Sequence, residues 1–97
     1  MASRIIWSPR AQKDRKEILA YWIQRNGTPT YSLRLNAQIK NALQTIKQHP
    51  EAGKSTDVAD VRFKWVRDYQ MYYKLKGDTV LILTLWDHRR DPSTFYL

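Results

Sequence analysis

The sequence contains no cysteine, which excludes disulfide bonds and thiolate metal sites and fits a reducing compartment. Its three glycines are too few and too scattered to form a glycine-rich phosphate-binding loop. No segment approaches the roughly 20 apolar residues needed to cross a bilayer, and the first ten residues lack the apolar run of a signal peptide. We therefore expect a cytoplasmic protein with no membrane partner.

Acidic residues are also scarce. Nine Asp and Glu stand against 17 Lys and Arg, which gives a formal net charge of +8. The excess lies in the first half, because residues 1–50 carry nine basic and two acidic residues, whereas residues 51–97 carry eight and seven. Such a surface attracts nucleic acid, the ribosome or an acidic protein segment.

The first half of the chain predicts a strand followed by two helices. Residues 4–7 are largely apolar and predict the strand. Ser8-Pro9 supplies a helix cap and a first-turn proline, and Asn26-Gly27 ends that helix, since both residues tolerate left-handed backbone angles. A second helix begins at Thr28-Pro29 and ends at His49-Pro50. The short link between the helices predicts an antiparallel hairpin.

Each helix has an apolar face at helical spacing. That face comprises Ala11, Ile18, Leu19, Trp22 and Ile23 in the first helix, and Leu35, Ile39, Ala42, Leu43 and Ile46 in the second.

The second half predicts a loop over residues 50–60 and then three strands. From residue 61 the apolar period is two, with tight turns at 67–68 and 77–78. One face carries Val61, Phe63 and Trp65 and then Tyr69, Met71, Tyr73 and Leu75; the other carries Arg62 and Lys64 and then Gln70, Tyr72 and Lys74. Residues 80–86 are almost wholly apolar, as in a central strand.

This order predicts one α+β domain over residues 1–97, in which a helical hairpin packs on a small antiparallel sheet in the order strand-helix-helix-strand-strand-strand. The first strand is expected at the side of the sheet. The helices would cover one face, which would leave Arg62, Lys64 and Tyr72 on the open face. Trp7, Trp22, Phe63, Trp65, Tyr69 and Tyr73 are expected in the core.

Few residues are suited to catalysis. Two histidines without metal-ligand spacing argue against a zinc site, nothing supports a Ser/His/Asp triad, and no cofactor is expected. The segment 86–92 follows the most apolar strand, where Arg89 could hold phosphate and His88 could act as acid or base. Alternatively, its aspartates and arginines pair with one another and merely finish the strand.

A second basic cluster comprises Lys54, Arg62, Lys64 and Arg67. On the open face, Arg62 and Lys64 would suit phosphate contacts, and Tyr72 could stack on a base. Ordinary solvent-facing alternation explains the same pattern. The apolar tail, residues 95–97, either folds back onto the sheet or contacts a partner.

Taken in order, these segments resemble the RelE/ParE toxins over nearly the whole chain. The resemblance is carried by Trp7-Ser8-Pro9-Arg10-Ala11, Ile18, Tyr21-Trp22, the loop with Pro50, Gly53 and Lys54, Val61-Arg62, Tyr69 through Tyr73, Gly77-Asp78, Ile82 and Arg89-Arg90-Asp91-Pro92. It implies the same strand, hairpin and three-strand fold. It also implies a cognate antitoxin whose C-terminal segment wraps the toxin in a hetero-oligomer.

The family divides by target. RelE-like members cut ribosome-bound mRNA, and for that branch the resemblance implies a catalytic set of Arg62, His88, Arg89 and Tyr96. ParE-like members poison DNA gyrase. For either branch, the target-binding or nucleic-acid-binding set would be Lys54, Arg62, Lys64, Arg67, Arg89 and Arg90.

Departures from the family pattern favour the gyrase-directed branch. Gln70 stands where nuclease members often have arginine, and Arg15 stands where the family usually has leucine. The tail after Arg90 offers no catalytic partner apart from Tyr96. We therefore expect an antitoxin-neutralised growth inhibitor acting on gyrase. The alternatives are a ribosome-dependent mRNA endoribonuclease and an inactive binding module with the toxin fold.

Overall fold

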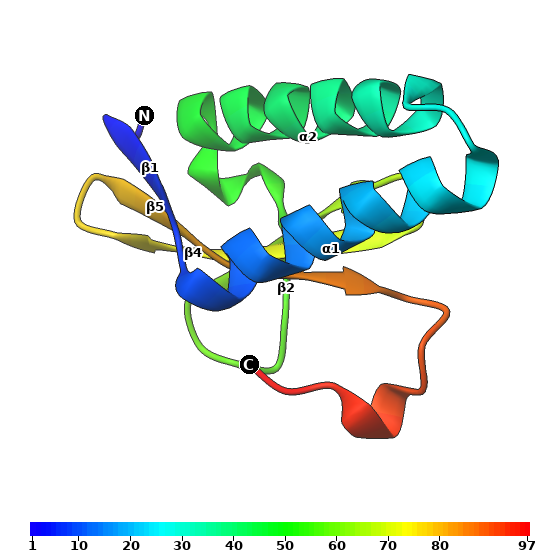
Figure 1. The fold of residues 1–97 in the computed structure, drawn as a ribbon. Coiled ribbons are helices and arrows are strands. Elements are labelled where there is room, and N and C mark those ends of the chain that lie inside the picture. The colour runs from blue at the N-terminus through cyan, green and yellow to red at the C-terminus, as the bar shows by residue number, and fades with distance from the viewer.

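The computed structural model describes residues 1–97 and has the predicted α+β order, with one additional short strand (Figure 1). In chain order the elements are β1 (Arg4–Trp7), α1 (Pro9–Asn26), α2 (Thr30–Gln48), the 3-10 helix η1 (Pro50–Ala52), β2 (Lys54–Ser55), β3 (Val61–Val66), β4 (Tyr69–Lys76), β5 (Thr79–Asp87) and the 3-10 helix η2 (Pro92–Thr94). The predicted fold class is confirmed. Neither long helix is apolar enough over its length to span a bilayer.

The strands form one sheet in the order β1-β5-β4-β3-β2. β2 through β5 pair antiparallel, as the short turns predict. β1 lies at the side of the sheet, as expected, and pairs parallel with β5, so that Arg4 lies opposite Thr79 and Trp7 opposite Ile82. The sheet is therefore mixed. Parallel neighbours need a long connection, which here comprises both helices and the next three strands.

The ends of α1 are set by local chemistry. The Ser8 hydroxyl accepts a hydrogen bond from the backbone N–H of Ala11 at 3.0 Å, and Pro9 occupies the first turn. Ser8 also donates to the carbonyl of Leu83 at 3.0 Å, which ties the helix start to β5. Gly27, with a φ of 72°, ends the helix in the left-handed conformation. The predicted capping residues of α1 are thus confirmed, whereas α2 begins at Thr30 without a side-chain cap, later than the predicted start at Thr28-Pro29.

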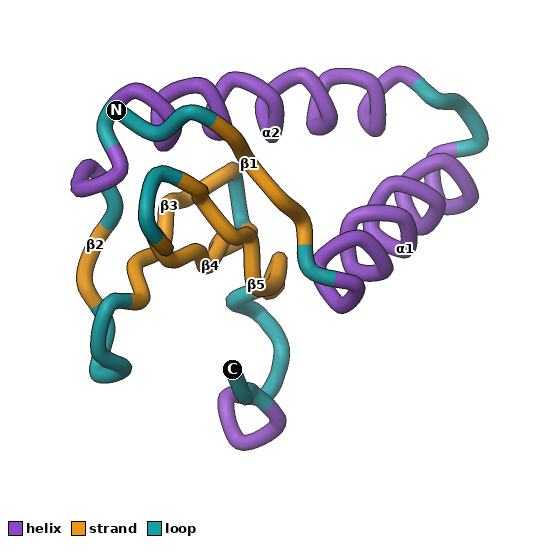
Figure 2. The backbone as a smooth tube through the Cα atoms, turned by 90° about the vertical axis from the view of Figure 1, so that its left-hand side faces the viewer, coloured by secondary structure: helices purple, strands orange, loops and turns teal.

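Both helices lie on one side of the sheet, and the C-terminal segment lies on the other (Figure 2). The main core fills the space between helices and sheet, and contains the predicted face of α2: Leu35, Ile39, Ala42, Leu43 and Ile46. α1 contributes Ala11, which is fully buried, and half-buried Ile18, Leu19 and Trp22; Ile23 is exposed.

A second apolar cluster lies on the face away from the helices. Its members are Val61, Tyr72 and Trp86, with Phe63, Leu83 and Phe95 packed against them. The Phe95 ring lies 4.9 Å from the rings of both Tyr72 and Trp86. The C-terminal segment therefore folds back and covers part of this face with an aromatic side chain.

The predicted assignment of the sheet faces is right for β4, because Tyr69, Met71 and Tyr73 lie in the main core, but it is wrong for β3. Arg62 pairs with Tyr73 and Lys64 with Met71, and residues directly opposite each other in antiparallel strands share a face. Tyr73 and Met71 belong to the main core, so Arg62 and Lys64 lie on the helix side. Tyr72 is buried in the second cluster, where burial raises the pKa of its hydroxyl. Its expected role in stacking on a base is therefore excluded in this conformation.

Trp65, which was expected in the core, is 41% exposed at the free edge of β3. The loop expected over residues 50–60 is also more ordered than predicted, because it contains η1 and the two-residue strand β2. β2 covers only the first half of β3, opposite Arg62 and Phe63. The edge of β3 from Lys64 onward therefore has no strand beside it.

Candidate functional site

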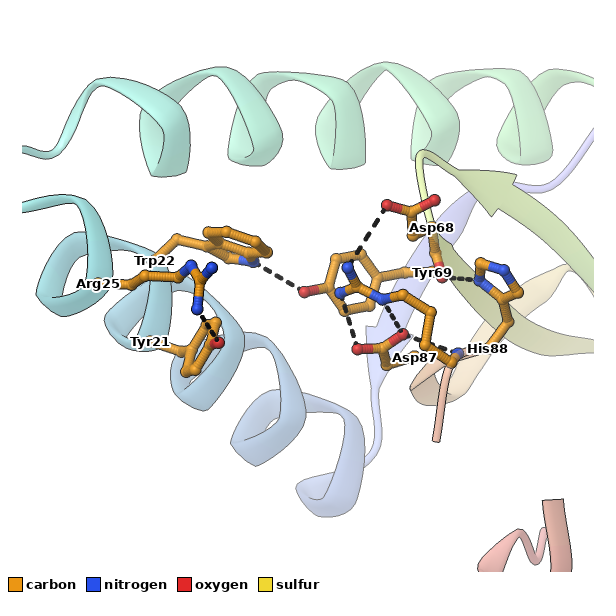
Figure 3. Close-up of polar contacts among 8 residues, drawn as sticks. Tyr21, Trp22, Arg25, Asp68, Tyr69, Asp87 and His88 are labelled. Carbon is orange, nitrogen blue, oxygen red and sulfur yellow. Dashed lines mark hydrogen bonds and ion pairs between the residues drawn. The ribbon is translucent and has the colours of Figure 1, made fainter. Parts of the chain in front are cut away.

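A groove of about 410 Å³ lies between α1 and the end of β5. We name it the α1–β5 groove. Its lining combines carboxylates, arginines and apolar side chains: Asp14, Glu17, Ile18, Tyr21, Tyr69, Leu85, Asp87, Arg89 and Arg90. Figure 3 shows the polar contacts that the lining residues Tyr21, Tyr69 and Asp87 make with their neighbours.

Leu85, which lines the groove, follows an irregularity in β5. The register between β4 and β5 shifts by one residue, so that Tyr72 lies opposite Thr84 whereas Tyr73 lies opposite Ile82. Asp14 of α1 stabilises this β-bulge, because its carboxylate accepts hydrogen bonds from the Thr84 hydroxyl at 2.5 Å and from the backbone N–H of Leu85 at 3.2 Å. A bulge reorients the side chains that follow it. This bulge precedes residues 86–92, the segment predicted to carry function.

Arg89 and Asp87 form a two-point ion pair in the groove. The Arg89 Nε and Nη2 atoms each donate to one oxygen of Asp87, both at 2.9 Å, and Asp68 lies 3.9 Å from Nη1 (Figure 3). Burial alone would raise the pKa of Asp87, but the hydrogen bonds from the side chain and backbone N–H of Arg89 outweigh it and lower that pKa. The same pair raises the pKa of Arg89.

Two tyrosines line the groove, Tyr21 of α1 and Tyr69 of β4. The Trp22 indole N–H donates to the Tyr69 hydroxyl at 2.8 Å, which connects α1 to β4 (Figure 3). Burial raises the pKa of Tyr69, and the bond from Trp22 opposes that shift. Tyr21 is 52% exposed and packs edge-on against Trp22. Its hydroxyl accepts a hydrogen bond from Arg25 at 3.3 Å. The groove therefore offers an exposed tyrosine on a fixed support.

His88 points away from this groove. Its Nδ1 lies 2.8 Å from the carbonyl oxygen of Asp68, and its ring packs edge-on against Trp65. In Figure 3 it lies on the side of Asp68 away from Trp22. This contact places His88 at the turn between β3 and β4.

The remaining residues after β5 are also held by neighbours. The Arg90 guanidinium lies over the Trp86 ring at 4.7 Å. Asp91 accepts a hydrogen bond from the N–H of Ser93 and starts η2, an interaction that lowers its pKa. The expectation that aspartates here pair with arginines is thus confirmed for Asp87 and Arg89, whereas Asp91 is not paired with Arg90.

The second basic cluster is spread along the β3 side of the sheet. Arg62 donates to the carbonyl of Gly53 at 2.8 Å. Arg67 donates to Gln38 of α2 at 2.5 Å and lies over the Tyr31 ring. Lys64 and Arg67 line a shallower groove against α2, and Lys54 is exposed on β2.

The four residues named for a nuclease do not converge. Arg62 is the second residue of β3, whereas His88 contacts Asp68, beyond the other end of that strand. About 13 Å of extended strand separate Arg62 from the last residue of β3. Tyr96 lies elsewhere, with its ring 3.7 Å from the Arg10 guanidinium in the first turn of α1. No three His, Asp or Glu residues gather as a metal site.

The contacts of Asp14 and the hydrogen bond between Trp22 and Tyr69 were not predicted from the sequence. One signal for Asp14 was available: it is one of only two acidic residues in the first 50, and it lies among cations at 13, 15 and 16. A lone acid in a basic helix indicates a specific contact, although the sequence does not name the partner. Nothing in the sequence indicates the bond to Tyr69, which joins residues 47 positions apart.

Comparisons with known proteins identify a solved structure with a similar fold and a family that matches the sequence. A helical hairpin on a mixed sheet is the fold of a solved structure described as "Chromosomal ParDE TA system from P. aeruginosa", with a TM-score of 0.74, 22% identity, and coverage of 88% of this chain and 94% of that one. Residues 5–92 match the family described as "ParE toxin of type II toxin-antitoxin system, parDE". The chain belongs to this ParE toxin family. No curated protein matches it.

Proposed function

We propose that the chain is a growth-inhibiting toxin whose target is DNA gyrase and which a cognate antitoxin neutralises. Membership of the ParE family supports the toxin role and the presence of an antitoxin partner. The gyrase target rests on the arrangement of the candidate residues, together with the departures from the family pattern at Gln70 and Arg15.

The state of Arg89 carries the proposal. A nuclease of this kind needs its arginines free to hold phosphate and close to a proton donor. Arg89 instead donates from Nε and Nη2 to the Asp87 carboxylate, which neutralises its charge, and Arg62 and Tyr96 lie in other parts of the molecule. This geometry suits a binding surface better than an RNA-cleaving site.

We infer that the target contacts the α1–β5 groove and the loop that follows β5. The groove presents the exposed Tyr21 beside paired charges on Asp87 and Arg89. Tyrosine and arginine are enriched among residues that dominate protein–protein binding energy. Among the other basic residues proposed for target binding, Arg90 continues this surface, whereas Lys54, Arg62, Lys64 and Arg67 lie toward β3.

The antitoxin would be attracted by the charge of the toxin. A net charge of +8 on a chain of this size accelerates association with an acidic segment and makes the rate sensitive to salt. An acidic antitoxin tail is therefore the partner chemistry that we propose.

The target can be tested by inducing the protein in bacterial cells without the antitoxin and mapping both DNA and RNA. We expect gyrase–DNA cleavage complexes and a DNA-damage response, and we expect purified gyrase to lose supercoiling activity in its presence. If translation stopped, mRNA were cut and DNA stayed intact, the target would be the ribosome and not gyrase. Harmless overexpression would indicate an inactive binding module.

A pair of variants tests the surface. The double substitution Arg89→Ala and Arg90→Ala should reduce gyrase inhibition, whereas Lys74→Ala with Lys76→Ala removes the same charge from the end of β4 and should not. Thermal melting of both variants separates a lost contact from a lost fold. Equal inhibition by the two variants would argue against this surface.

A further inference from the structure

Helix α1 separates charges of opposite sign. The two acidic residues of the first half, Asp14 and Glu17, both line the α1–β5 groove. Arg15 and Lys16 instead line a second groove against α2 and β1. On this second side, no acidic side chain therefore offsets the positive charge of the helical hairpin.

The second groove has a volume of about 500 Å³ and is lined by Trp7, Gln12, Arg15, Lys16, Leu19 and Asn36. We name it the hairpin groove. It contains two cations, two amides and no carboxylate. Its lining is rich in N–H groups, which are donors that an anion with several oxygen acceptors can use.

Arg15 is fixed in this groove without being neutralised. Its Nε and Nη2 atoms both donate to the side-chain oxygen of Asn36, at 3.1 and 2.6 Å, and its guanidinium lies 5.0 Å from the centre of the Trp7 ring. An arginine has five N–H donors, so Nη1 keeps both of its own. The partner atom is a neutral amide oxygen, and the full positive charge remains.

The cations around Arg15 are also unpaired. Lys16 follows it in α1, and Lys40 lies one helical turn beyond Asn36 on α2. The ion pairs of the chain involve Lys13 and Arg89 and none of these residues. A prepositioned arginine is thus accompanied by Lys16 on its own helix and by Lys40 on α2, next to the groove lining.

We propose that the hairpin groove binds the phosphodiester backbone of a nucleic-acid duplex. A phosphate offers oxygens to the free Arg15 donors, and successive phosphates along a strand can reach Lys16 and Lys40. An acidic peptide fits less well, because the groove offers it only two apolar side chains, Trp7 and Leu19, as anchors. The inference does not depend on gyrase, since the contact is with the nucleic acid itself.

The test is fluorescence anisotropy of a labelled DNA duplex, and of an RNA duplex of the same sequence, across a salt series. The Arg15→Ala and Lys16→Ala double variant should bind the preferred duplex about tenfold more weakly. Its log–log salt slope should be smaller by about 2, because two phosphate contacts are lost. The duplex that the parent binds more tightly shows whether the groove prefers DNA or RNA.

The matched control is Lys74→Ala with Lys76→Ala, which removes the same charge at the end of β4. It should retain the parent slope. If both double variants lost the same affinity for the duplex, overall charge alone would explain the binding. That result would overturn the proposal. So would tighter binding to poly-glutamate than to either duplex, or no duplex binding by the parent.

A second variant guards against misfolding, since Arg15 connects α1 to α2. Lys16→Glu changes an exposed side chain that makes no hydrogen bond. It should weaken duplex binding more than Lys76→Glu does while both proteins melt at the parent temperature. Indistinguishable binding by these two folded variants would also overturn the proposal.

Discussion

The Tyr73 hydroxyl accepts a hydrogen bond from the backbone N–H of Gly53 at 2.9 Å and donates one to the carbonyl of Pro50 at 2.6 Å. One side chain of β4 thus fixes the segment that joins α2 to the sheet. A Cβ atom at position 53 would overlap this hydroxyl, which is why the position requires glycine.

Replacing Tyr73 by phenylalanine should lower the free energy of unfolding by about 2 kcal/mol, because two buried backbone groups lose their partner. Urea denaturation measures the change. Tyr96→Phe is the control, since that tyrosine is exposed and its hydroxyl makes no hydrogen bond. Equal stability of the two variants would contradict an anchoring role for Tyr73.

Asp14→Ala should cost about 1–3 kcal/mol of stability, because the Thr84 hydroxyl and the Leu85 N–H are left without an acceptor at the bulge. Glu17→Ala lies one turn away and breaks only an exposed 3.9 Å contact with Lys13, so it should change stability by less than about 0.5 kcal/mol. Denaturant unfolding of the pair distinguishes a specific contact from loss of negative charge in α1.

The pair of Asp87 and Arg89 should make stability depend on pH in the acid range. The folded-state pKa of Asp87 lies below that of the unfolded chain, about 3.9. Its contribution is therefore present above that value and disappears as the pH falls through the lowered pKa. The stability difference between the parent and Asp87→Asn should be constant above about pH 5 and shrink below about pH 4.

Unfolding free energies measured across this range provide the check. Arg89→Ala should produce a similar loss of pH dependence, because Arg89 supplies the side-chain hydrogen bonds that lower the pKa. A parent-to-variant difference that stays constant down to about pH 2 would show that the pair does not form in solution.

Phe95→Ala should uncover the second apolar cluster. We expect a loss of about 1–2 kcal/mol, since Phe95 packs on both Tyr72 and Trp86. Binding of a hydrophobic dye should increase at the same time. Leu97→Ala, at a position that is 43% exposed, should show neither effect. Unchanged dye binding in the Phe95 variant would mean that the tail does not cover the sheet in solution.

The elements that sequence reasoning located well are those with local signals. The bounds of β1 and the ends of α1 follow from Ser8-Pro9 and Asn26-Gly27, which act within a few residues of themselves. The turns at 67–68 and 77–78 were equally local. The parallel pairing of β1 could not be derived in this way, because its partner β5 lies at the far end of the chain.

The choice of sheet face failed for a related reason. A period of two tells which residues of one strand share a face, but not which face of the next strand continues it: Phe63 shares a face with Tyr72 and not with Tyr73. Here both faces of β3 and β4 are apolar in part, because Phe95 covers the second one. Likewise, only part of the candidate site could be predicted from the sequence. Its loop, residues 87–90, followed from the strand before it, whereas Asp14 and Trp22 enter it through contacts distant in sequence.

The parallel contact of β1 with β5 joins the first strand to be synthesised to the last. While the ribosome is still at work, Arg4 through Trp7 have no neighbour to pair with, and Ser8 lacks the carbonyl of Leu83 on which it closes. The sheet can be completed only after β5 has been synthesised. The toxin is therefore not fully folded during most of its own synthesis.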